Sequence, residues 1–105
     1  MRTYKTAAYN KWLSGLKDAD ARRRILVRVR RLELGNTGDS KALGAGLNEL
    51  RIDYGPGYRV YYGWHGCELV LLLAGGDKSS QNRDVVRARE LLISAIAELK
   101  EGEQE

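Results

Sequence analysis

The sequence lacks the residues on which several common chemistries depend. It has one cysteine and one histidine, so no disulfide can form within the chain and no set of soft ligands is available for a metal. We see no serine, histidine and aspartate in the pattern of a nucleophilic triad. No glycine-rich run follows a predicted strand as a phosphate-binding loop would. We therefore expect no metal and no cofactor, and the remaining chemistry depends on arginine, lysine and tyrosine, which suit phosphate groups.

Long hydrophobic runs are also absent. No N-terminal stretch resembles a signal peptide, and no segment approaches the length of a membrane span. Together with the lone cysteine, this predicts a cytoplasmic protein that does not contact a membrane. A chain of 105 residues has room for one hydrophobic core, so we expect a single domain over 1–105.

Positive charge is in excess and unevenly distributed. The net charge is +4; residues 1–60 carry 13 Lys and Arg against 6 Asp and Glu, whereas residues 61–105 carry 5 against 8. Arginine dominates the basic set, which favours bidentate contacts with phosphate. The basic half suggests a polyanion such as nucleic acid, and an acidic protein partner is equally compatible with it.

The first third of the sequence predicts a short strand and two helices. Residues 1–5 have strand character. Thr6 can cap a helix over 7–16, and Asp18 or Asp20 can cap a second helix over 21–35 that ends at a glycine. Because few residues separate the helices, we expect a helical hairpin. The segment 35–46, which contains four glycines, is interpreted as a flexible connection.

Three strands and a helix are predicted after this connection. The run LNELRIDY (47–54) alternates, YRVYYG (58–63) follows the loop GPG, and ELVLLLAG (68–75) is continuously apolar, as in a strand buried on both faces. A helix over 84–100 has apolar residues in phase. The fold class is therefore α+β: a mostly antiparallel sheet with helices against one face.

Two arginines in neighbouring strands predict a basic surface. By alternation, Arg51 and Arg59 point away from the core side of their strands and share a face with Tyr61. Lys41 precedes the first of these strands and Lys78 follows the last. If the strands pair in sequence order, these side chains converge on the open face of the sheet. A basic face with an aromatic residue suits RNA or phosphate.

The sequence is also compatible with simpler roles for the arginines. Arg51 and Arg59 are also placed to pair with Glu49 and Asp53 across the hairpin. A further cluster on the second helix is compatible with a solvated face, with phosphate contacts or with an acidic partner. Its members are Arg22, Arg23, Arg24, Arg28, Arg30 and Arg31.

Two segments carry a resemblance to a known family. GDSKALGAGLNELRIDYGPGYRVYY and LVLLLAGGDKSSQNRDVVRA are similar to the phage-derived killer proteins of addiction modules, a branch of the RelE/ParE toxin superfamily near the HigB-like toxins. The resemblance implies a RelE-like fold and a helix-turn-helix antitoxin encoded by a neighbouring gene. The toxin would contact operator DNA only through this antitoxin. It also implies a metal-independent endoribonuclease, or mRNA interferase, that cuts mRNA on the ribosome and inhibits translation.

The resemblance also implies roles for individual residues. Arg59 matches a recurrent arginine of the ribonuclease branch, and Arg51 and Lys78 lie where relatives have basic catalytic groups. The residues expected to bind RNA or phosphate are Lys41, Tyr61, Arg83, Arg23 and Arg30. Several relatives have a tyrosine near the start of the last helix. This sequence reads RDVVRA there and has no tyrosine. The alternatives to an endoribonuclease are a non-enzymatic, ParE-like inhibitor of DNA gyrase and a corepressor that acts only with its antitoxin.

Overall fold

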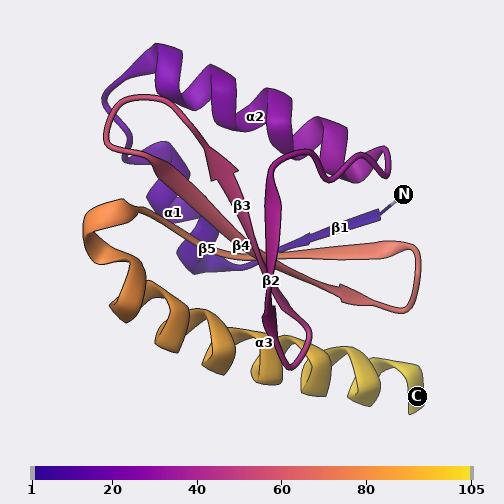
Figure 1. Ribbon diagram of the computed structural model, residues 1–105. Coiled ribbons are helices and arrows are strands. Elements are labelled where there is room, and N and C mark those ends of the chain that lie inside the picture. Colours follow the sequence, from indigo (N-terminus) through magenta and orange to yellow (C-terminus); the bar gives the residue numbers. More distant parts are fainter. Residues whose placement is uncertain (1, 105) are drawn as a thin grey trace.

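A five-stranded sheet with helices on both faces forms the protein (Figure 1). The computed structural model describes residues 2–104, with side chains described for 2–102. The elements in chain order are β1 (Arg2–Lys5), α1 (Ala7–Ser14), α2 (Ala19–Glu33), β2 (Ser40–Gly44), β3 (Leu47–Ile52), β4 (Tyr58–His65), β5 (Leu69–Asp77), the 3₁₀ turn η1 (Lys78–Ser80) and α3 (Gln81–Gln104). Met1, included in the predicted first strand, lies outside the described residues.

The sheet is mostly antiparallel. Its strand order is β1-β5-β4-β3-β2, and β1 pairs with β5 in parallel while the other neighbours pair antiparallel. This arrangement confirms the predicted α+β class with its C-terminal helix, and it is compatible with a RelE-like fold. None of the helices within 2–104 has the length and apolar character needed to cross a membrane.

The two N-terminal helices begin at the predicted caps. Thr6 Oγ1 accepts a hydrogen bond from the Tyr9 backbone N–H at 3.0 Å. Asp18 accepts from the backbone of Asp20 and Ala21, so α2 begins at Ala19. The buried residues of α1 and α2 pack on one face of the sheet, in a cluster formed by Tyr9, Ile25, Val29, Leu32, Leu50, Ile52, Val60, Tyr62, Val70 and Leu72.

The second face of the sheet is covered as well, and this corrects the prediction of an open face. Helix α3 packs there in a second cluster formed by Leu47, Tyr61, Leu69, Leu71, Leu73, Ala74, Ala88, Leu92 and Ala95. The physical reason lies in β5, whose side chains are apolar on both sides. A strand of this kind requires a cover on each face.

The segment 35–46 contains a strand, so its interpretation as a flexible connection was wrong. Ser40, Lys41 and Ala42 of β2 pair with Leu50, Glu49 and Asn48 of β3. The tight turn from β2 into β3 has left-handed backbone at three successive residues, Gly44 (φ 92°), Ala45 (φ 53°) and Gly46 (φ 83°). As a short edge strand with exposed side chains, β2 lacks the apolar alternation by which a strand is recognised.

Two adjacent glycines of β5 allow a helix to approach each face of the sheet. A Cβ built on Gly75 would lie 2.1 Å from Cε3 of Trp12, which belongs to α1. A Cβ built on Gly76 would lie 1.9 Å from Oδ2 of Asp84, which belongs to α3. A side chain at Gly75 would overlap the Trp12 ring, and one at Gly76 would displace the Asp84 carboxylate.

We predict that Gly75→Ala destabilises the protein by about 1–3 kcal/mol, because the new methyl group overlaps the Trp12 ring. The measurement is the free energy of unfolding from chemical denaturation. Gly102→Ala is the matched control, since a Cβ at Gly102 meets no atom within 4 Å. Equal stability of Gly75→Ala and the wild type would contradict the close packing of Trp12 on β5.

Candidate functional site

Three of the basic residues predicted from the sequence meet around one hollow at the end of the sheet. We call it the basic hollow; its volume is about 470 Å³ and its lining residues are Asp39, Arg51, Asp53, Gly55, Pro56, Gly57, Arg59 and Lys78. Arg51 and Arg59 are direct partners in the register of β3 and β4. They therefore share a face of the sheet, as alternation predicts. Lys78 is the first residue of η1, directly after β5.

A buried ion pair holds Arg59 in place. Its Nε lies 3.2 Å from Oε1 of Glu49 in an ion pair without hydrogen-bond geometry, and the two side chains are only 13% and 1% exposed. Nη1 donates to the Tyr58 carbonyl at 3.1 Å. Glu49 Oε2 in turn accepts from Nε2 of Gln81 at 2.7 Å. The first residue of α3 thus fixes Glu49, and Glu49 fixes the guanidinium.

Arg51 is held more loosely. Its Nη2 lies 3.0 Å from Oδ1 of Asp39, in a pair whose side chains are 39% and 53% exposed. The backbone here is tied to α2, because Arg28 donates to the Arg51 carbonyl at 2.8 Å and to the Asp39 carbonyl at 3.2 Å. Both arginines therefore pair with acidic groups, as the sequence allowed. Arg59 pairs with Glu49, whereas Arg51 pairs with Asp39 and not with Asp53.

Lys78 is the exposed cation of the basic hollow. Within residues 2–102 it has no ion-pair partner. Its position is set by Asp77, whose carboxylate accepts from the Ser79 backbone N–H at 2.8 Å. The Ser79 hydroxyl also donates to Asp77 and lowers the pKa of that carboxyl, with smaller contributions from backbone N–H groups and from Arg83. Gly57 (φ 82°) brings the loop close, since a Cβ there would lie 3.4 Å from Arg59 Nη1 and 3.6 Å from Lys78 Cβ.

Tyr61 lies beneath α3 and is not the exposed aromatic that the sequence predicts. Its side chain is fully buried, and its hydroxyl has no hydrogen-bond partner among the described residues. Burial raises the pKa of Tyr61 strongly, and the carboxylates of Glu49 and Asp84 raise it further. The phenol therefore stays neutral and forms part of the support behind Arg59 rather than a surface for a base.

The remaining predicted residues divide between two surfaces. Lys41 is exposed on the edge strand β2, opposite Glu49 in the register. Arg83 and Lys78 line a polar hollow of about 510 Å³ beside the basic hollow, at the start of α3. Arg23 and Arg30 lie on α2, which covers the other face of the sheet. The structure thus does not bring these two arginines to the basic hollow.

The described side chains provide no metal site. Within residues 2–102 no three His, Cys, Asp or Glu side chains are close enough together to hold an ion. His65 ends β4 and lies six residues from Arg59, which is about 20 Å along a strand. The carboxylates of Asp39 and Asp53 and the ammonium of Lys78 are the groups that line the basic hollow and can exchange a proton.

Sequence reasoning missed two supporting residues, Asp39 and Gln81. Asp39 lies in the segment interpreted as a flexible connection, so no strand pairing pointed to it. Gln81 lies three residues before the predicted start of the last helix. The signal for Gln81 was the run DKSS directly before it, because Asp77 and Ser80 form a capping box there.

The two ion pairs predict unequal losses of stability. Glu49→Ala should lower the free energy of unfolding by about 3 kcal/mol, because it leaves the buried Arg59 charge unpaired. Asp39→Ala, which breaks the exposed pair with Arg51, is the matched control and should cost less than about 1 kcal/mol. Both are measured by chemical denaturation. Similar losses for the two variants would show that burial does not distinguish the pairs.

The lowered pKa of Asp77 predicts that its contribution to stability depends on pH. Its pKa in the folded protein is lowered from its ordinary value of 3.8, so the contribution is complete above the unfolded pKa and is lost as the pH falls through the folded pKa. Asp77→Asn should therefore flatten the loss of stability below about pH 4 while costing little at pH 7, since Asn also caps helices. Denaturation midpoints at pH 7 and pH 3 test this; parallel losses in both proteins would contradict it.

Comparisons with known proteins place the chain in a family. The family model for phage-derived Gp49-like proteins (DUF891) matches residues 11–103. An uncharacterized protein of Haemophilus influenzae is 48% identical over 84 residues, which are 80% of this chain and 85% of that protein. The chain therefore belongs to the phage-derived Gp49-like family, a family associated with the toxins of toxin-antitoxin systems.

Proposed function

We propose that this protein is the toxin of a toxin-antitoxin pair and that it inhibits translation by cutting mRNA on the ribosome, as the HigB-like branch of RelE toxins does. The observation that carries the proposal is the meeting of Arg51, Arg59 and Lys78 around the basic hollow. The three cations come from three different elements and surround a space open to solvent. Such a space suits a phosphate of an RNA chain.

The proposed reaction uses the RNA's own hydroxyl as the nucleophile. The ribose 2′-oxygen attacks the adjacent phosphorus and forms the P–O2′ bond, while the P–O5′ bond breaks. The 2′-hydroxyl loses its proton and the leaving 5′-oxygen gains one. The products are a 2′,3′-cyclic phosphate and a 5′-hydroxyl end. Negative charge accumulates on the non-bridging oxygens in the transition state, and fixed cations there lower the barrier.

Arg59 is held by contacts that leave part of its guanidinium free for a phosphate. Its contact with Glu49 uses Nε, and its bond to the Tyr58 carbonyl uses one N–H of Nη1. In the described part of the chain Nη2 has no partner. A guanidinium fixed in this way loses little conformational entropy when it meets a phosphate. We therefore assign to Arg59 the main role in stabilising the transition state.

The other cations have supporting roles in the proposal. Lys78 has no ion pair to give up, so it can approach the scissile phosphate at little cost. Arg51 is drawn toward Asp39 and supplies the third charge. Arg83 in the neighbouring hollow and Lys41 on the edge strand are placed to contact phosphates on either side of the cut.

The proposal predicts that Lys78→Ala and Arg59→Lys each reduce cleavage by about 10²–10³. Lys78 is exposed and unpaired, so its removal leaves the fold intact. Arg59→Lys keeps a charge beside Glu49 but loses the fixed fork of N–H groups. Lys100→Ala, which removes one exposed positive charge at the far end of α3, is the control and should cut like the wild type.

The measurement is induced expression without the neighbouring antitoxin gene, followed within minutes by primer extension on abundant mRNAs. Discrete cuts inside translated frames, lost in Lys78→Ala and Arg59→Lys but kept in Lys100→Ala, would support the proposal. Growth arrest with intact mRNA and altered DNA supercoiling would replace it with inhibition of gyrase. No arrest at all would favour a corepressor that acts only with its antitoxin.

A further inference from the structure

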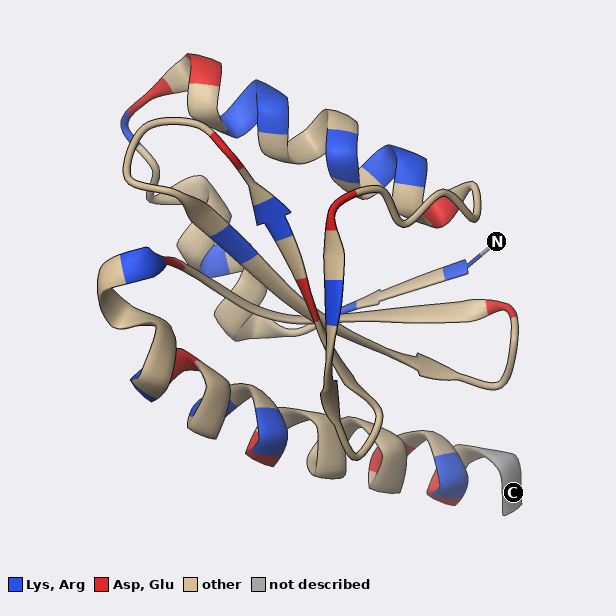
Figure 2. Cartoon of the chain, in the orientation of Figure 1, with Lys and Arg blue, Asp and Glu red and all other residues tan. Residues whose placement is uncertain are grey.

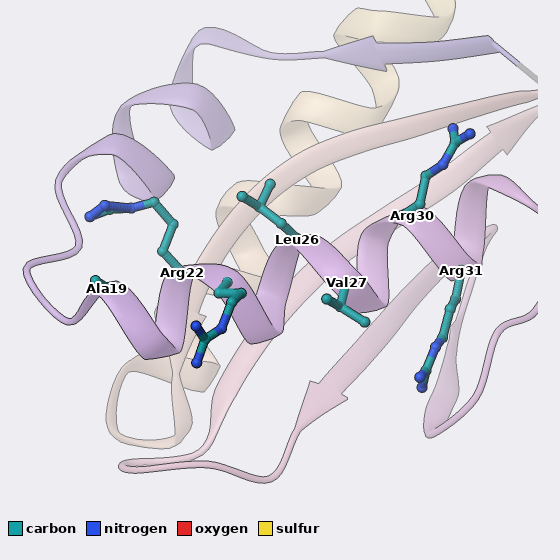
Figure 3. Close-up of a pocket in the computed structure, with 7 residues that line it drawn as sticks. Ala19, Arg22, Leu26, Val27, Arg30 and Arg31 are labelled. Atoms are coloured by element: carbon teal, nitrogen blue, oxygen red, sulfur yellow. The ribbon is translucent and has the colours of Figure 1, made fainter.

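The outer side of α2 has an apolar centre between arginines. We call it the α2 patch; around a shallow depression of about 510 Å³ it contains Ala19, Arg22, Arg23, Leu26, Val27, Arg30 and Arg31. Figure 3 shows Leu26 along one row of the helix between Arg22 and Arg30, and Val27 beside Arg31 on the next row. Residues four apart lie above one another on a helix. Each apolar side chain therefore has an arginine one turn before it and one turn after it.

The apolar centre is uncovered. Leu26 and Val27 are 46% and 45% exposed, and Leu34, two turns beyond Leu26, is 69% exposed. The hydrophobic residues of the same helix that face the sheet are fully or almost fully buried. Val27 also lines a second depression of about 400 Å³ between α2 and the end of β3, which includes Ile52 and Tyr54. This second depression is mixed in character, because four arginines and Asp53 line it together with Val27 and the half-buried Tyr54.

Most of the surrounding arginines are available for a partner. Among residues 2–102, Arg30 and Arg31 have no ion-pair partner, and Arg23 pairs only with the exposed Asp20 on its own helix. Arg22 is partly engaged, since its Nη2 donates to the Leu16 carbonyl at 3.1 Å. Figure 2 shows that Lys and Arg recur along α2, with acidic residues near its two ends. The α2 patch is therefore strongly positive around an apolar centre.

We propose that the α2 patch binds an acidic amphipathic helix of a partner protein, with its apolar stripe on Leu26 and Val27 and its carboxylates on the arginines. An apolar centre with arginines around it fits the anatomy of a protein interface, in which a polar rim surrounds an apolar core and arginine is enriched. RNA fits less well, because Leu26 and Val27 cannot stack on bases as aromatic side chains do, and the guanidinium of Arg24 already covers one face of the nearby Tyr54 ring. Phosphates would reach only the outer arginines and leave the apolar centre uncovered.

The charges also argue against occupants from this chain. A symmetric contact between two copies would place the same arginines against one another, and like charges repel. The acidic residues of α3 lie on the opposite face of the sheet. A separate acidic protein is the occupant that complements the α2 patch. Arg59 and Lys78 line neither depression beside α2, although Asp53 lines both the second depression and the basic hollow. A partner seated on Leu26 and Val27 therefore leaves these two cations uncovered.

The test uses a synthetic helical peptide of 15 residues, the length of α2, with leucines at helical spacing and glutamates on both sides of them. A peptide of the same composition, with the leucines distributed around the helix, is its control. Fluorescence anisotropy gives the affinity, and backbone NMR shifts locate the contact. We expect binding by the amphipathic peptide and shifts centred on residues 22–31.

Two sets of variants distinguish a specific site from general attraction. Leu26→Gln with Val27→Gln should weaken binding at least about tenfold, whereas Val86→Gln with Ile93→Gln, which changes two exposed apolar residues of α3 (61% and 71% exposed), should leave it unchanged. Arg30→Glu with Arg31→Glu should abolish binding to the glutamate peptide and create binding to its lysine counterpart. A variant that gains affinity for the lysine peptide must still have a folded α2, so unfolding cannot explain this result.

Several results would overturn the proposal. These are equal binding of the control peptide, equal weakening by the α3 variants, or NMR shifts centred on the basic hollow. Competition by a uridine oligonucleotide that also binds Leu26→Gln/Val27→Gln normally would assign the α2 patch to RNA. The outcome is independent of the proposed ribonuclease, because Lys78→Ala, which should lose cleavage, should bind the peptide like the wild type.

Discussion

The burial of β5 on both faces is the constraint on which the rest of the structure depends. Its alternate side chains enter two separate cores, one beneath α1 and α2 and one beneath α3. At its end, Gly75 and Gly76 let Trp12 of α1 and Asp84 of α3 approach the strand from opposite sides. The path of α3 is thereby fixed from its first turn. That turn places Gln81 against Glu49, and so determines where Arg59 points.

The residues that support the basic hollow belong to the core, whereas the hollow itself opens to solvent. A buried ion pair contributes little net stability, because desolvation of the two charges offsets their attraction. What the pair of Glu49 and Arg59 provides is orientation: the guanidinium cannot turn away without leaving a carboxylate buried and unpaired. Tyr61, with its unpaired hydroxyl, lies in the same layer. These polar groups beneath α3 thus form the support of the Arg59 guanidinium.

The two basic surfaces of the molecule lie mainly on opposite sides of the sheet and adjoin at Asp53, which lines both the basic hollow and the second depression beside α2. One consists of three cations at the end of the strands and is backed by α3; the other is the outer side of α2. The net positive charge of the N-terminal half, which by itself fits nucleic acid and acidic protein equally, divides between them. The basic hollow is polar and suits phosphate, whereas the α2 patch has an apolar centre and suits a protein helix.

The sequence by itself determined the local features: the cap Thr6, the choice of Asp18 or Asp20 as the second cap, the two-sided apolar strand β5, and the shared face of Arg51 and Arg59, which follows from the period of two in a strand. Only the tertiary structure decided that α3 covers this face, that Tyr61 is buried and that β2 pairs at the edge. The meeting of Lys78 with the arginines followed from the sequence on the condition that the three strands pair in sequence order, and the register meets that condition. Periodicity reports which side of an element is apolar. Which distant segment covers that side depends on packing between residues far apart in the chain, and a single sequence does not record it.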